Sequence, residues 1–375
     1  MTNYINRYKQ QMEYQSFYPA MINRPVPDFN REVDLLLSTA MLELGKLEAY
    51  SQLVPDINYF IKMHVTKEAN TSNRIEGTRT EIDEIFLPKE DISDEKKDDW
   101  QEVQNYINAL EFSLKELNSR LPLSMRLLKE THQKLLVDVR GKYRHPGEIR
   151  ISQNWIGGSS LKDAFFIPPH PDDLSELLTD LEKFWHNQEL QIPDLIKIAI
   201  SHYQFETIHP FLDGNGRLGR LLIVLQLIEN RILTYPTLYL SAFFEKNKGA
   251  YYDSLTMARQ TADLNQWLRF FLSGVIETAR NSIVTFQKII KLRKVYQERI
   301  MIFNGNVSQN ANTLINTMFT NPIVNTEQVM ELLDCSWPAA NNLITRLIKL
   351  DILREKTGFK RNRTYELYAY LELFK

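Results

Sequence analysis

Apolar residues recur every three or four positions along most of the chain, which is the pattern of helices that bury one face. The pattern predicts helices over 35–53, 55–75, 94–117, 124–136, 171–187, 193–207 and 215–232. A longer pattern over 263–299 predicts one long helix or two, and shorter ones follow at 311–320, 326–333 and 338–350. Pro55 separates the first two helices, and Gly77 is placed to cap the second. A mainly helical fold is therefore expected.

Two segments depart from the helical pattern. Residues 147–168 alternate over Ile149-Arg150-Ile151-Ser152, pass through a Gly-Gly turn and end at two prolines, which predicts a β-hairpin. Near the C-terminus, 352–356 and 364–370 predict two strands that flank a basic turn. Three helices followed by such a pair are typical of a winged helix-turn-helix.

These patterns divide the chain into three parts. We expect an N-terminal helical region over 1–110, a helical core over 111–303 and a winged helix over 304–375. The first 30 residues carry no pattern from which a role follows.

Composition narrows the class of protein. The chain has 375 residues, 43% of them hydrophobic and 25% charged, which is typical of a globular protein with two or three domains. A net charge of −2 means that any nucleic-acid-binding surface must be local. Cys335 is the single cysteine, so no internal disulfide can form. Residues 1–25 lack the apolar core of a signal peptide and no run spans a membrane, so a cytoplasmic location is expected.

The stretch from His209 to Arg220, HPFLDGNGRLGR, carries the clearest chemistry. Three of the 13 glycines fall between Gly214 and Gly219, which indicates a backbone that passes close to another group. The stretch satisfies the dinucleotide pattern G-x-G-x-x-G, but a helix precedes it where that pattern requires a strand. A helix–loop–helix remains, whose second helix directs free N–H groups at an anion.

The side chains of this stretch extend the phosphate-binding interpretation. Arg217 and Arg220 are three residues apart and share a helix face near the anion. Asp213 would repel phosphates unless a Mg²⁺ ion bridges them, because Mg²⁺ prefers one carboxylate plus phosphate oxygens. His209 has a side chain that titrates near neutrality and can accept a proton from a hydroxyl group.

On these residues the chain resembles the Fic family, whose signature is H-x-F-x-[DE]-G-N-G-R-x-x-R. All specified positions match: His209, Phe211, Asp213, Gly214, Asn215, Gly216, Arg217 and Arg220. The resemblance implies a helical-bundle core and the transfer of AMP from ATP to a Ser, Thr or Tyr hydroxyl of a target protein and of the enzyme itself. Relatives that transfer phosphate carry Lys at the position of Gly216, so this chain is similar to the adenylyltransferases.

The resemblance also implies roles for single residues. His209 is the base, Asp213 holds Mg²⁺, and the phosphates lie on Gly214, Asn215, Gly216, Leu218 and Gly219 with Arg217 and Arg220. The hairpin at 147–168, with its residues 149–152, resembles the flap that aligns the target segment by strand addition. Tyr251 and Tyr252 resemble residues that pack against the adenine.

A second motif, Ser72 to Gly77, is similar to the family's inhibitory sequence [ST]-x-x-x-E-[GN]. Ser72 and Glu76 are four residues apart and share one face of the helix over 55–77. The helix dipole disfavours a carboxylate in the last turn, so Glu76 calls for a cationic partner. The resemblance identifies that partner as Arg220, and implies the class whose inhibitory helix precedes the core in the same chain.

Several alternatives stay open at this point. In some relatives the inhibitory Glu orients a water that removes AMP, so de-AMPylation through Glu76 is a second activity. Transfer of UMP or phosphate is another. A DNA-binding regulator with a nucleotide-sensing Fic core is a third, because the expected wing turn holds Lys356, Lys360, Arg361 and Arg363. Residues 305–375 nevertheless carry eight basic and seven acidic residues, which leaves protein docking and a homodimer equally open.

Overall fold

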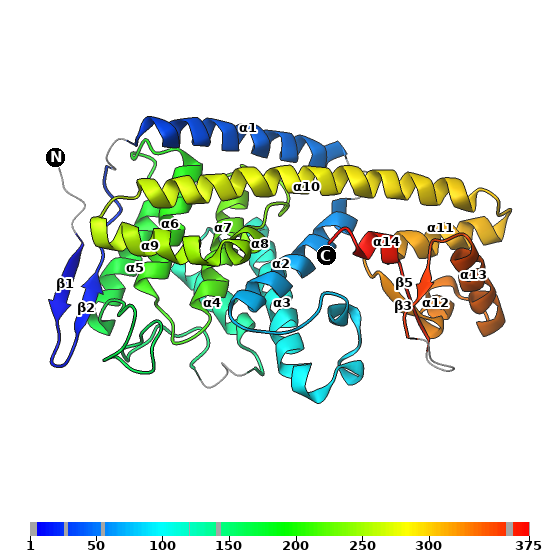
Figure 1. Cartoon of the computed structure of the whole chain (residues 1–375), viewed down its shortest axis with the longest axis horizontal. Helices are drawn as coiled ribbons and strands as arrows, with labels where there is room; N and C mark the ends of the chain where they lie inside the picture. The colour runs from blue at the N-terminus through cyan, green and yellow to red at the C-terminus, as the bar shows by residue number, and fades with distance from the viewer. Residues whose placement is uncertain are drawn as a thin grey trace.

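The computed structural model of the chain describes residues 6–25, 29–53, 57–119, 121–139, 144–357 and 363–374. These residues are mainly helical, as the apolar periodicity predicts (Figure 1). Pro55 and the wing residues Lys360 and Arg361 lie outside the described part.

The N-terminal part begins with a feature that the sequence did not indicate. β1 (Arg7–Gln10) and β2 (Gln15–Tyr18) form an antiparallel hairpin. Two helices follow, α1 (Arg31–Leu53) and α2 (Ile57–Ile75). Gly77 has a φ of 105°, so the glycine ends α2 as expected.

The central part is a bundle of helices. Three single 3₁₀ turns lead from α2 to α3 (Lys97–Ser119). The helices that follow are α4 (Met125–Leu135), α5 (Leu174–His186), α6 (Asp194–Ile208), α7 (Asn215–Glu229), α8 (Ser241–Lys246) and α9 (Lys248–Thr261). The pattern over 263–299 forms a single helix, α10 (Asn265–Ile300), which lies alongside α1 in Figure 1.

The hairpin predicted at 147–168 is not a regular β-hairpin. Its arms meet at one antiparallel bridge, between Ile156 and Phe166. Regular pairing fails for two reasons: the N–H of Arg150 donates to Pro210 outside the segment, and Asp163 ties the turn by accepting bonds from Ser159 and Ser160. The segment is therefore an irregular loop whose two arms are joined by the single bridge between Ile156 and Phe166.

The C-terminal part has the three expected helices, α11 (Asn306–Met318), α12 (Thr326–Leu333) and α13 (Trp337–Lys349). The two expected strands are present but short, as β4 (Arg354–Glu355) and β5 (Thr364–Glu366), and a third strand, β3 (Ile323–Asn325), pairs with β5. The predicted strand over 364–370 ends early because α14 (Tyr368–Leu371) begins there.

The C-terminal part is joined to the rest through α10, which runs from the bundle into it (Figure 1). Tyr296 on this helix is buried, and its ring lies 6.4 Å from that of Phe319. The C-terminal part also contacts the N-terminal region, where Phe374 packs edge-on against His64 of α2 and Lys356 forms an ion pair with Asp83. One continuous apolar core therefore spans the bundle and the C-terminal part.

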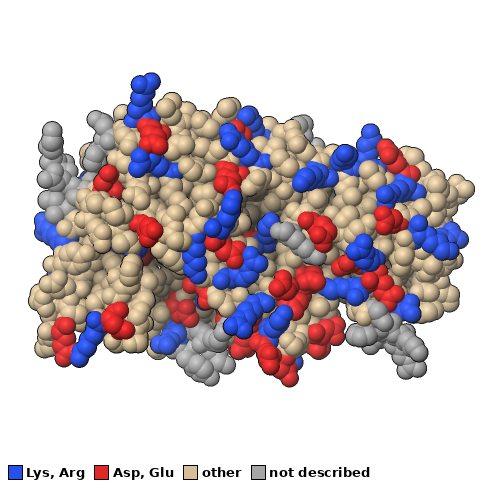
Figure 2. Space-filling view, viewed as in Figure 1, with Lys and Arg blue, Asp and Glu red and all other residues tan. Residues whose placement is uncertain are grey.

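The surface carries both charges. On the face drawn in Figure 2, basic and acidic side chains alternate over the bundle and over the C-terminal part. Within the described residues, no helix combines the length and apolar character needed to cross a membrane.

Two helical glycines give a matched test of packing. A Cβ on Gly274 of α10 would lie 2.6 Å from the ring of Phe243, whereas one on Gly45 of α1 would meet no atom within 4 Å. Alanine favours a helix over glycine by about 0.5–1 kcal/mol, and overpacking costs about 1–3 kcal/mol. Urea unfolding should show Gly45→Ala as stable as the parent or more so, and Gly274→Ala less stable than Gly45→Ala by at least about 1 kcal/mol. Equal stability of the two variants would contradict the packing described for α10.

Candidate active site

The loop between α6 and α7 is held in shape by the residues at its two ends. His209 ends α6 in a left-handed conformation, φ 50° and ψ 60°, and its N–H donates to Phe205 O at 2.9 Å. Gly214, with a φ of 74°, precedes α7. The Asn215 side chain closes the loop from inside, because it accepts from Phe211 N at 2.9 Å and donates to Phe211 O at 2.8 Å. The motif backbone is thus fixed before any ligand binds.

His132 on α4 clamps the loop from outside. Gly147 N donates to its Nδ1 at 2.8 Å, so the proton sits on Nε2, which donates to Asp213 O at 2.8 Å. The ring stacks on Phe211 at 3.9 Å between centroids. Burial lowers the pKa of His132 to about 4, which keeps it neutral. Nothing in the sequence indicated the partners of this histidine.

Arg150 is a second clamp, a role of its side chain that the sequence did not indicate. Its side chain was expected on the target-docking flap, but it is 3% exposed and Nε donates to His209 O at 2.9 Å. Its other nitrogens donate to Ser152 O at 3.2 Å and Pro169 O at 2.5 Å. Ile151, next to it, is 94% exposed. Only the outward residues of the segment remain available to a partner.

The glycines of the motif stand where other groups approach α7. A Cβ on Gly216 would lie 2.5 Å from Glu76 Oε1 and 3.0 Å from Arg220 Nη1. One on Gly219 would overlap the carboxylate of Glu206, and one on Gly214 would lie 3.2 Å from the His132 ring. Leu218 faces the core and is fully buried. Other groups therefore do approach the backbone of the motif closely, as expected, and in this structure those groups are protein side chains.

Arg220 is held by both residues of the second motif. Its Nη2 lies 2.7 Å from Glu76 Oε1, while Nε donates to Ser72 Oγ at 2.8 Å and Nη2 to Ser72 O at 2.9 Å. The Arg220 side chain is 3% exposed and that of Glu76 is 38% exposed. Burial acts to raise the pKa of Glu76, but the Arg220 guanidinium outweighs it and the pKa is lowered. The contact between Glu76 and Arg220 that the family resemblance implied is present.

Arg217 is occupied as well, by partners that the sequence did not reveal. Its Nη1 lies 3.1 Å from Glu102 Oε2 of α3 and 3.3 Å from Asn73 Oδ1 of α2, and Nη2 lies 3.5 Å from Asp213 Oδ1. Glu102 sits in an ordinary amphipathic helix, so nothing marked it beforehand. Both arginines of the motif are therefore paired with carboxylates of the N-terminal helices.

Two further titratable groups lie beside the loop. Burial, followed by the charges of Arg150 and Arg259, lowers the pKa of His209 to about 4, so its imidazole is neutral at pH 7. Burial raises the pKa of Glu206 to about 7. Neither Glu206 nor Arg259 was singled out from the sequence. A neutral imidazole at this position can accept a proton.

The two tyrosines expected near the adenine differ in their surroundings. Tyr251 is 2% exposed, bonds His202 Nε2 through its hydroxyl at 2.9 Å and stacks on Phe244 at 4.5 Å. Tyr252 is 41% exposed. Tyr251 is thus a core residue in this structure, and only Tyr252 presents a ring to the surface.

Comparison with known proteins agrees with this geometry. A profile described as Fic/DOC family matches residues 122–227, and one described as Fic/DOC family N-terminal matches residues 35–115. The chain belongs to the Fic/DOC family.

Relatives of this Fic chain include the protein adenylyltransferase Fic of Aedes aegypti, 31% identical over 175 residues, which are 44% of this chain and 31% of that protein. The protein of the same name from Drosophila erecta is 27% identical over 237 residues, 62% of this chain and 42% of that protein. The Fic chain thus spans about a third to two fifths of the length of these relatives.

Solved structures share the fold. A Fic family protein from Desulfovibrio desulfuricans superposes with a TM-score of 0.58 at 19% identity, over 92% of this chain and 98% of that one. A Fic domain containing signaling protein from Bacteroides thetaiotaomicron gives a TM-score of 0.53 at 21% identity, over 68% and 97%. The first match extends over nearly all of this chain.

The clamp by His132 gives a pH test. The pKa of His132 is about 4 in the folded chain, against an ordinary value of 6.5, so above pH 6.5 the ring is neutral in both states and its titration does not change the stability. As the pH falls from 6.5 towards 4, the unfolded chain binds a proton that the folded chain does not, so the folded chain becomes less stable. We expect imidazole nitrogen NMR to show His132 as the neutral Nε2–H tautomer at pH 7 and still neutral at pH 5. An imidazolium signal for His132 at pH 5 would contradict the clamp.

Proposed function

We propose that this Fic chain is a self-inhibited protein adenylyltransferase, which transfers AMP from ATP to a Ser, Thr or Tyr hydroxyl of a target protein and of itself. The observation that carries the proposal is that three features lie together at the loop between α6 and α7. His209 is neutral, the N-terminus of α7 opens onto the loop, and Arg217 and Arg220 lie on its first turns. The names of the relatives support the same class of reaction.

The residues have complementary tasks in the transfer. His209 accepts the proton of the target hydroxyl, whose oxygen then forms a bond to the α-phosphorus of ATP. The bond from that phosphorus to the bridging oxygen breaks, and pyrophosphate leaves with the electron pair. The N–H groups at the start of α7, with Arg217 and Arg220 once released, stabilise the negative charge on the phosphates.

The donor set suits magnesium that arrives with the nucleotide. Asp213 is 43% exposed on its side chain, and one of its oxygens already accepts from Gly214 N at 2.6 Å. Among the described residues, no three metal-ligating side chains come together. One carboxylate plus phosphate oxygens is the set that Mg²⁺ takes from a protein and a nucleotide, so Asp213 would hold the ion and it would neutralise phosphate charge.

Self-inhibition follows from where Glu76 lies. The carboxylate occupies the space over Gly216 and holds Arg220. Because a buried guanidinium paired in this way cannot also bind a phosphate, we propose that the Glu76–Arg220 pair must open before ATP binds in a productive position. Glu76 is ionised, which also suits it to accept a proton from water, so removal of AMP is the second activity that we propose for the same residue.

The loop over 147–168 is the proposed docking surface for the target. Ile151 and Phe165 are 94% and 71% exposed on it, next to the loop that carries His209. An extended target segment would pair with the backbone near Ile151 and Ser152. The Arg150 side chain would take no part, because it is bonded to the loop that carries His209. Tyr252 is the proposed contact for the adenine.

The C-terminal part is proposed to act by packing and protein contact. Lys356 pairs with Asp83 and Arg363 with Glu355, while the guanidinium of Arg354 lies 4.1 Å from the centre of the Tyr368 ring. Basic side chains used in this way are not free to contact phosphates, which weighs against DNA as the partner of a winged helix over 304–375. We keep 1–110 and 111–303 as the inhibitory region and the catalytic core.

The first prediction concerns the group that is transferred. Incubation with Mg²⁺ and ATP labelled at the α-phosphate should label the chain and a target, and label at the γ-phosphate should not be transferred. His209→Ala should abolish the transfer because the hydroxyl then keeps its proton. Transfer of the γ-phosphate label would identify a kinase. Transfer of label from UTP in place of ATP would identify a uridylyltransferase. The absence of any label, even with Glu76→Gly, would indicate a nucleotide sensor.

The second prediction concerns the brake. Glu76→Gly should raise automodification at least about tenfold, because ATP no longer has to displace a carboxylate from the buried Arg220 guanidinium, and a tenfold change corresponds to only about 1.4 kcal/mol. Glu245→Gly is the matched control, since Glu245 pairs with Arg74 of the same helix at 2.6 Å on the surface. The proposal fails if the two variants are labelled equally. Any substitution that loosens α2 would then raise labelling, and the contact with Arg220 would not be the cause.

A further inference from the structure

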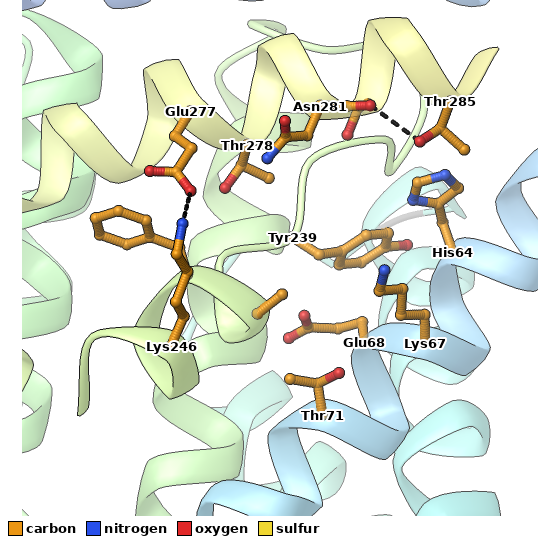
Figure 3. Close-up of a pocket in the computed structure, with 13 residues that line it drawn as sticks. His64, Lys67, Glu68, Thr71, Tyr239, Lys246, Glu277, Thr278, Asn281 and Thr285 are labelled. Carbon is orange, nitrogen blue, oxygen red and sulfur yellow. Dashed lines mark hydrogen bonds and ion pairs between the residues drawn. The ribbon is translucent and has the colours of Figure 1, made fainter. Parts of the chain in front are cut away.

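A cavity of about 220 Å³ lies beside α2, outside the loop that carries His209. Its walls come from α2, α8, α10 and the segment before α8 (Figure 3). The lining combines apolar surface from Phe243 and Ala242 with polar side chains, chiefly His64, Lys67 and Tyr239. The catalytic roles proposed above use none of these residues.

Three polar groups at one end of the cavity have no partner within the described part of the chain. The hydroxyl of Tyr239, a residue that is 6% exposed, and Nε2 of His64 are both buried without a hydrogen bond. Lys67 forms neither a hydrogen bond nor an ion pair with any described residue. Figure 3 shows the Lys67 amine, the Tyr239 hydroxyl and the His64 ring gathered at the same end. Buried polar groups without partners are uncommon, and here they share one empty space.

The acidic groups of the lining are already neutralised or bonded. Glu68 accepts from the Tyr106 hydroxyl at 3.1 Å and from the hydroxyl and N–H of Ser241, and it feels the charge of Arg220. Glu277 forms an ion pair with Lys246 at 2.8 Å, at the opposite end of the cavity in Figure 3. Lys67 is therefore left as the uncompensated charge, and burial together with Arg74 lowers its pKa. An anion beside the amine would reverse that shift.

We propose that this cavity binds a small organic anion, with a carboxylate or phosphate group held by Lys67 and Tyr239 and its body lying against Ala242 and Phe243. Tyr239 donates its hydroxyl proton, since burial raises its pKa well above the usual range. Nε2 of His64 supplies a third contact when it carries the proton. A cationic amine with a hydroxyl donor beside an apolar wall is a suitable arrangement for such a ligand.

The position of the cavity gives the ligand a regulatory consequence, which rests on the proposed function. Lys67 and Thr71 of α2 line the cavity, while Ser72 of the same helix and Glu76, directly after its end, hold Arg220. A ligand that ties α2 to α8 and α10 stabilises the position of α2 in which the Glu76–Arg220 pair is closed. The occupied cavity thus strengthens the brake.

The test measures binding directly, so it does not depend on catalysis. Thermal unfolding of the whole chain is followed with inorganic phosphate or succinate, against chloride at equal ionic strength. Lys67→Gln removes the charge, and Lys62→Gln is the matched control on the exposed face of the same helix. Any anion that binds Arg217 and Arg220 shifts all variants alike, so the difference between variants reports the cavity.

At least one probe should raise the Tm of the parent and of Lys62→Gln by about 2 °C more than that of Lys67→Gln. Tyr239→Phe keeps the ring and loses only a hydroxyl without a partner, so it should fold normally and bind the same probe about 5–10-fold more weakly in calorimetry. Equal Tm shifts in the parent and Lys67→Gln, or no shift with either probe, would overturn the proposal. Binding that leaves AMP labelling unchanged would keep the site and refute its link to the brake.

Discussion

The structure depends on the neutralisation of two buried arginines. Arg217 and Arg220 stand on the first turns of α7 with side chains almost inaccessible to water. A buried guanidinium without a partner destabilises a fold by several kcal/mol, so each must meet a carboxylate. Glu102 on α3 and Glu76, directly after the end of α2, supply the two carboxylates. The same pairs that satisfy the core thus fasten the N-terminal helices over the N-terminal end of α7.

The loop of the motif is held by groups that carry no chemistry of their own. Its carbonyl oxygens accept from Arg150 on one side and from His132 on the other, and Asn215 closes it from inside. Such bonds fix His209 in a left-handed conformation that a non-glycine residue rarely adopts. The geometry of His209 is therefore a property of its surroundings, which belong to α4 and to the loop before Trp155.

Local patterns in the sequence were sufficient for the helices and the motif. The contact between Glu76 and Arg220 was predicted through the resemblance to the Fic family, because the spacing within each motif gives a helix face but not the partner. The contacts of Glu102 and Arg150 were not predictable. Glu102 looks like any polar residue of an amphipathic helix, and Arg150 looks like an outward-facing residue of a strand. The hairpin of β1 and β2 was missed because its stabilising bonds reach distant residues, such as the bond from Phe17 N to Ile167 O. Tertiary partners, and not local preference, decide such positions.

The space above Gly216 links two positions that are 140 residues apart in the chain. The absent side chain of Gly216 is what leaves room for the carboxylate of Glu76, so neither position can change size without affecting the other. A carbon atom added at 216 would stand 2.5 Å from the Glu76 carboxylate and 3.0 Å from Arg220 Nη1, so it would crowd both partners of the pair at once. If the pair acts as the proposed brake, a lineage could therefore lose its regulation through a substitution inside the motif over 209–220, with the sequence of α2 unchanged.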